Sequence, residues 1–121
     1  MLKKRLNSFR YAFAGLGELL RSQPNAKIHL VAACAVAAAG FYFEITTTEW
    51  CLATFAVAMV FSAEAFNTAI ENLTDLASPD YHPLAGKAKD VAAAAVLVAA
   101  IGAAAVGLLI FGPRVLGAIG L

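Results

Sequence analysis

The stretch Glu64-Ala-Phe-Asn-Thr-Ala-Ile-Glu71-Asn-Leu-Thr-Asp75 follows a strongly apolar run and is polar at regular intervals. Its regularly spaced polar residues, here named the polar stripe, are Glu64, Asn67, Thr68, Glu71 and Asp75. The steps of three, one, three and four residues return each side chain to the same face of an α-helix. At roughly 1.5 Å of rise per residue the stripe is about 16 Å long. The pattern predicts a helix that is polar on one face and apolar on the others.

Carboxylates at this position require an explanation, because an ionised side chain in a bilayer costs at least about 2.5 kcal/mol and commonly faces a functional site. Glu64 and Glu71 lie two helical turns apart. One could serve as a general base and the other as a ligand of Mg²⁺, which prefers carboxylate oxygens and phosphates. Asn67 could orient either carboxylate. The alternative reading is a structural polar seam between subunits.

Composition predicts a membrane protein. The chain has 121 residues, of which 61% are hydrophobic and 14% are charged, whereas about a quarter are charged in soluble domains. One domain, residues 1–121, is expected at this length. Cys34 and Cys51 lie in apolar segments without metal-ligand spacing, which indicates small buried side chains. No zinc motif, Rossmann fingerprint or P-loop is present, and no nucleic-acid partner is expected.

The apolar pattern predicts an all-α fold with one surface helix and three membrane helices. Residues 1–25 alternate basic and apolar positions, as in an amphipathic helix at a membrane surface. The predicted membrane helices span residues 26–43, 48–74 and 91–112. Pro79, Pro83 and Gly86 favour a loop over residues 75–90, and Pro113 is expected to end the third membrane helix.

Basic residues predict the orientation. Six of the nine lysines and arginines lie between the N-terminus and Lys27, two lie in the 75–90 segment, and the connection 44–49 has none. Because cytoplasmic loops are rich in Lys and Arg, the N-terminus and the 75–90 segment are expected to face the cytoplasm. This orientation brings the polar stripe to the cytoplasmic surface, where ATP and Mg²⁺ are available.

Further candidate residues flank the stripe. Lys89 could hold a phosphate and Asp90 could bind metal or orient the lysine. Membrane anchoring and a helix start would suffice for Lys87 but explain this pair less well, because Asp90 lies against an uncharged span. His82, in a loop, is expected to be a surface or packing residue. His29, just inside the first membrane helix, is expected to hydrogen-bond to a neighbouring helix.

In this order and spacing, the residues resemble the prokaryotic diacylglycerol kinase / undecaprenol kinase family. The family pattern is roughly E-x-x-N-(S/T)-A-I-E-x-x-x-D, then Y-H, then A-K-D. Segments 64–75, 78–82 and 86–90 match it in turn. Segments 7–16 and 25–30 also resemble the family's amphipathic N-terminus and the start of its first membrane helix, so the likeness covers nearly the whole chain.

The resemblance implies a small enzyme of the bacterial inner membrane, assembled as a homotrimer with active sites shared between neighbouring subunits. It implies transfer of the γ-phosphoryl group of MgATP to the hydroxyl of a membrane lipid alcohol, either diacylglycerol or undecaprenol. By motif match Glu64 would be the general base and Glu71 a metal ligand. The nucleotide and phosphoryl site would be completed by Asn67, Asp75, Lys89 and Asp90.

One position departs from the family pattern. Just before the Asn25-Ala-Lys-Ile-His29 segment the family usually has a glutamate that binds metal, and this chain has Gln23. An amide oxygen can still bind Mg²⁺ but supplies no charge, so weaker metal binding, a shifted metal stoichiometry or compensation by Glu18 is expected. A non-catalytic membrane assembly protein with a polar helix seam remains the alternative function.

Overall fold

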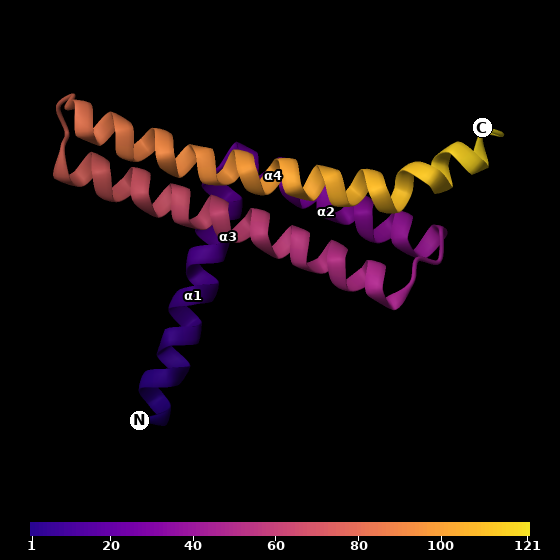
Figure 1. Cartoon of the computed structure of the whole chain (residues 1–121). Coiled ribbons are helices and arrows are strands. Elements are labelled where there is room, and N and C mark those ends of the chain that lie inside the picture. Colours follow the sequence, from indigo (N-terminus) through magenta and orange to yellow (C-terminus); the bar gives the residue numbers. More distant parts are fainter.

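Four helices account for nearly the whole chain, and the computed structural model describes all 121 residues. The helices are α1 (Leu2–Ser22), α2 (Pro24–Tyr42), α3 (Thr47–Ala77) and α4 (Pro83–Ala118). The chain therefore has the predicted all-α architecture. Helices α3 and α4 run antiparallel and side by side, α2 also packs against α3, and α1 projects away from the other three (Figure 1).

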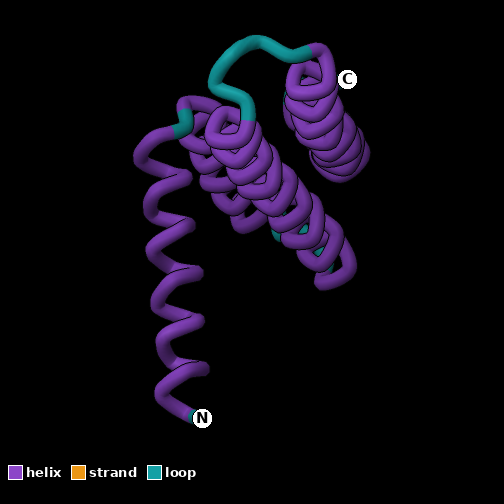
Figure 2. Tube along the Cα trace, turned by 90° about the vertical axis from the view of Figure 1, so that its left-hand side faces the viewer, coloured by secondary structure: helices purple, strands orange, loops and turns teal.

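The packing makes α3 the central helix. It contacts all three other helices, whereas α2 and α4 barely touch each other. Figure 2 shows the loop at 78–82 that reverses the chain between α3 and α4. The direction of each α3 side chain around the helix axis therefore decides whether it faces α1, α2, α4 or the surroundings.

Three of the helices are long and apolar enough to cross a membrane: α2 with 19 residues, α3 with 31 and α4 with 36. Only nine of the 121 residues are buried within the chain, and most large apolar side chains point outward. A soluble protein of this size would bury its large apolar side chains, so this distribution is that of a membrane protein.

Local sequence explains where the helices begin. Helix α2 starts at Pro24, which tolerates the first helical position because no hydrogen bond is required of its nitrogen there. At the start of α3 the Thr46 hydroxyl accepts a hydrogen bond from the backbone of Glu49, whose carboxylate accepts one from the backbone of Thr46. Helix α4 begins at Pro83 after His82, whose Nδ1 accepts a hydrogen bond from the Leu84 nitrogen at 3.1 Å.

The predicted loop over residues 75–90 is too long. Helix α3 continues to Ala77 and α4 begins at Pro83, so the connection spans only residues 78–82. Proline and glycine often interrupt a helix, but Pro83 occupies the first turn of α4 and Gly86 lies within the helix. As a result, Lys89 and Asp90 lie on a rigid helix instead of a loop.

The predicted end of the third membrane helix at Pro113 is also wrong. Helix α4 continues through Pro113 to Ala118 and bends near its C-terminal end (Figure 1). Proline removes one backbone hydrogen bond and crowds the preceding turn, which bends a helix without necessarily ending it. The first predicted membrane helix, residues 26–43, agrees with α2 to within two residues at each end.

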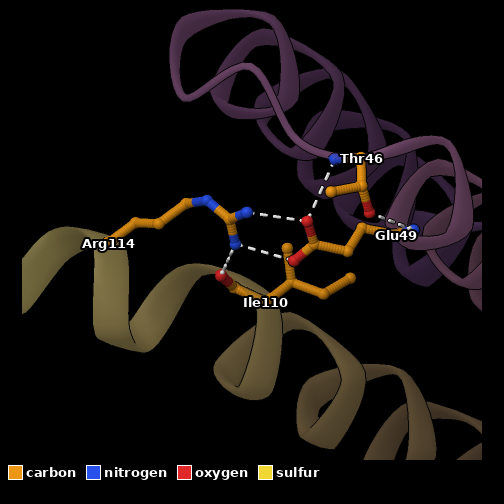
Figure 3. Close-up of polar contacts among 4 residues, drawn as sticks. All are labelled: Thr46, Glu49, Ile110 and Arg114. Atoms are coloured by element: carbon orange, nitrogen blue, oxygen red, sulfur yellow. Dashed lines mark hydrogen bonds and ion pairs between the residues drawn. The ribbon is translucent and has the colours of Figure 1, made fainter.

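A forked ion pair joins α3 to α4 at the end far from the polar stripe (Figure 3). The Arg114 guanidinium donates to both carboxylate oxygens of Glu49 at 2.7 Å and to the carbonyl oxygen of Ile110 at 2.6 Å. Both side chains are mostly covered. Together with the buried side chains of Ile45 and Ala53, this pair fixes α4 along α3 and so fixes the face that α4 presents to the stripe.

Candidate functional site

The polar stripe lies on the inward face of α3. Glu64 is the most buried charged side chain of the protein, with 2% of its surface exposed, and exposure increases along the stripe to Asp75. On the opposite faces of the same turns, Phe66 and Leu73 are 71% and 65% exposed. Helix α3 is therefore polar inside and apolar outside, as the spacing of the sequence predicts.

Three polar atoms of the stripe are buried without a hydrogen-bond partner. They are Oε1 of Glu64, Oδ1 of Asn67 and Oγ1 of Thr68. The one hydrogen bond within the stripe runs from Nδ2 of Asn67 to Oε1 of Glu71 at 3.3 Å. A buried polar group without a partner costs about 1–3 kcal/mol, and natural proteins keep few of them. Three in adjacent turns indicate a place where a ligand or another polar surface supplies the missing bonds.

Helix α2 supplies a cross-helix neighbour for the buried carboxylate. Nε2 of His29 lies 3.2 Å from Oε1 of Glu64, and 23% of the histidine side chain is exposed. Nε2 lies within ion-pair distance of Oε1, and no protein group donates a hydrogen bond to Oε1, so this oxygen is available to accept a proton. The sequence predicted that His29 contacts a neighbouring helix, but it did not identify the partner.

Helix α4 brings Lys89 to the exposed end of the stripe, where its ammonium group forms an ion pair with Asp75. The charged groups predicted for a phosphate site are thus partly assembled across the α3–α4 interface. Asp90 is exposed and makes no hydrogen bond or ion pair within the chain. The structure therefore joins Lys89 to the stripe by a direct contact and shows no such contact for Asp90.

Gln23 lies at the junction of α1 and α2, where its backbone bonds both helices and its side chain makes no hydrogen bond. Nearby Glu18 forms an ion pair with Arg21 at 2.6 Å. Glu18 also lines a cavity of about 350 Å³ between α1 and α3, together with Thr68 and Asn72. Asn72 was not among the predicted site residues, although it follows Thr68 by four positions and so shares its face.

Below the stripe, α2, α3 and α4 surround an apolar cavity of about 300 Å³. Its walls are mostly alanine, valine and phenylalanine, and His29 is its one titratable residue. Val60 and Phe61, one turn before Glu64, belong to its lining. The buried carboxylate and the apolar cavity are therefore neighbours, which suits a ligand with an apolar body and one polar group.

Fold and site together define a helical membrane protein with an inward-facing acidic site beside an apolar cavity. The sequence profile described as prokaryotic diacylglycerol kinase matches residues 10–111. The chain belongs to the prokaryotic diacylglycerol kinase family.

Related proteins of known name support this family assignment. The undecaprenol kinase of Bacillus subtilis is 42% identical over 113 residues, which cover 93% of this chain and 92% of that protein. The diacylglycerol kinase of Synechocystis is 40% identical over 84% of this chain but only 59% of its own length, and that of Haemophilus influenzae is 29% identical over 78% and 80%. The chain is therefore a lipid kinase, and the non-catalytic alternative finds no support among these relatives.

Proposed function

We propose that this kinase transfers the γ-phosphoryl group of MgATP to the hydroxyl of a membrane lipid alcohol at the polar stripe. The observation that carries the proposal is the free lone pair on the buried carboxylate of Glu64. A general base must accept a proton from the substrate, so it needs an acceptor atom that no protein donor already occupies. The apolar cavity beside Glu64 suits the hydrocarbon part of such a substrate.

In this proposal Glu64 accepts the hydroxyl proton while the lipid oxygen attacks the γ-phosphorus. The ammonium group of Lys89, held by Asp75, contributes positive charge toward the phosphates, and Asp90 completes that end of the site. Asn67 is held by Glu71 through its amide group, which leaves its free Oδ1 to accept a bond from the nucleotide. Phosphoryl transfer depends on this kind of positioning and charge stabilisation.

The residues present fit Mg²⁺ without a complete protein cage. No group of three histidine, cysteine, aspartate or glutamate side chains gathers in the structure. Mg²⁺ suits such a site, because it is commonly held by one or two carboxylates plus phosphate oxygens and water. Glu71 would hold it, with the amide oxygen of Gln23 as a weaker second ligand. When bound there, Mg²⁺ would neutralise charge on the phosphates.

Two lipid alcohols are candidates. We put undecaprenol first, because the relative named undecaprenol kinase matches this chain over nearly the full length of both proteins. Diacylglycerol is the second candidate, since two other relatives carry the name diacylglycerol kinase. The proposal includes assembly as a homotrimer with shared sites, in the bacterial inner membrane, with α1 on the cytoplasmic surface. The many large apolar side chains that point outward support it, because neighbouring subunits and lipid could cover them.

The test is ATP-dependent phosphorylation of each lipid by the purified protein in detergent. Wild type should phosphorylate at least one of them in the presence of Mg²⁺. Glu64→Gln should lower kcat by about 10²–10⁴-fold, the usual contribution of a general base. Glu44→Gln is the matched control, because Glu44 is exposed in the connection at the other end of α3. Full activity of Glu64→Gln would refute the base assignment, and failure of wild type on both lipids would refute the substrate class.

A further inference from the structure

Glu64, the general base of the proposed reaction, is almost completely buried. Only 2% of the Glu64 side chain is exposed, yet each turnover leaves one proton on this carboxylate. The next lipid can be deprotonated only after that proton has left. A carboxylate enclosed in this way needs a neighbouring group that can take the proton outward.

His29 is the titratable side chain in contact with Glu64. Its Nε2 lies 3.2 Å from Oε1, and the imidazole is 23% exposed, about ten times more than the carboxylate. His29 makes no other ion pair and no side-chain hydrogen bond within the chain. The other residues that line the apolar cavity with His29, including Val57, Ala100 and Ala104, carry no side chain that could accept a proton.

The position of His29 along α2 also bears on where the proton can go. It is the sixth residue of α2, about 7.5 Å from the start of the helix at a rise of 1.5 Å per residue. The beginning of α2 joins α1 beside the middle of the α3–α4 pair (Figure 1). Because 23% of the imidazole and only 2% of the carboxylate are exposed, a proton on His29 lies nearer the surface of the chain than a proton on Glu64.

We propose that His29 accepts the proton from Glu64 after each phosphoryl transfer and releases it to water, an inference that rests on the proposed function. First the O–H bond of the lipid breaks and its proton goes to Glu64, while a new O–P bond forms and ADP departs with the electrons of the broken P–O bond. The proton then moves from Oε1 of Glu64 to Nε2 of His29 and on to solvent. One proton is released for each lipid phosphorylated. His29 takes the proton from Glu64 and not from the lipid hydroxyl, although it also lines the apolar cavity.

The first test compares His29→Ala, His29→Gln and wild type in the lipid kinase assay. Glutamine retains size and hydrogen bonding but cannot accept a proton at neutral pH. Both variants should lose about 10²-fold in kcat, the lower end of the range for positioned proton transfer, with the KM for lipid unchanged. Added imidazole should restore several-fold activity to His29→Ala and should not affect wild type or Glu64→Gln.

Two results would overturn the inference. Full activity in His29→Gln would show that a polar side chain suffices there, and full activity in His29→Ala would show that the proton leaves by another path. Wild type must phosphorylate lipid in the same assay, and its failure would instead refute the proposed function.

A second measurement does not depend on turnover. The chain has two histidines, His29 and His82, so ¹⁵N NMR of labelled imidazoles in detergent can resolve both. Glu64→Gln should move the nitrogen signals of His29 and leave those of His82 unchanged. Unmoved His29 signals would refute the contact itself, whatever the enzyme's activity.

Discussion

Gly40→Ala should destabilise the protein through a single methyl group. A Cβ at Gly40 would lie 2.5 Å and 2.7 Å from the ring atoms Cη2 and Cζ2 of Trp50. Carbon atoms in ordinary contact are about 3.5–4.0 Å apart, so the ring or the helix must retreat by about 1 Å. The ring cannot swing away freely, because it packs against Phe41 with centroids 4.9 Å apart.

The two contributions to this substitution oppose each other. Overpacking a filled position costs about 1–3 kcal/mol. Replacing glycine by alanine within a helix returns about 1 kcal/mol. We expect a net loss of about 1 kcal/mol in the free energy of unfolding, taken from the middle of the first range.

The assay is unfolding by sodium dodecyl sulfate in mild detergent, followed by the helical circular dichroism signal. Gly102→Ala is the matched control, because a Cβ there meets nothing within 4 Å, and it should not be destabilising. Trp50→Phe should relieve most of the effect of Gly40→Ala, since the smaller ring vacates the contact. Equal stability of Gly40→Ala and wild type, or an equal loss in the Trp50→Phe background, would refute the reasoning.

Three further substitutions probe other contacts. Gln23→Glu should lower the Mg²⁺ concentration for half-maximal kinase activity, because it adds a charged oxygen, and an unchanged titration would remove position 23 from the metal site. Arg114→Lys should lower the unfolding midpoint, because lysine cannot make the forked pair with Glu49, and strict additivity with Glu49→Gln would contradict this coupling. Thr46→Ala should cost about 1 kcal/mol by removing the helix cap, whereas Thr46→Ser should retain it.

The inward face of α3 could be predicted from sequence because helical periodicity is a local property. Spacing alone placed Glu64 and Asn67 on one face and Phe66 on another, and the structure confirms this division. The prediction of a loop over residues 75–90 was wrong for a reason that is also local. Proline ends a helix from within but also starts one, and only the capping of α4 by His82 decides between these roles at Pro83.

Contacts between distant residues could not be predicted from this one sequence. Glu49 and Arg114 are 65 positions apart, and nothing in either segment indicates the other. The contact of His29 with Glu64 is similar, because the partner depends on how far α2 is rotated and shifted against α3. Gln23 stood out only through the family pattern, and its assignment to the metal stays a prediction.

The length of α3 bears on how a membrane lipid and a water-soluble nucleotide could reach the same site. The helix has 31 residues, about 46 Å at 1.5 Å per residue, whereas the hydrocarbon core of a bilayer is about 30 Å thick. Counted from Trp50, Glu64 lies about 21 Å along the axis and Asp75 about 37 Å, so a hydrocarbon core about 30 Å thick that began at Trp50 would end between them. In the proposed reaction, the lipid would approach the Glu64 end of the polar stripe and the nucleotide would approach the Asp75 end. The phosphoryl group would then pass from a nucleotide in water to a lipid that stays in the membrane.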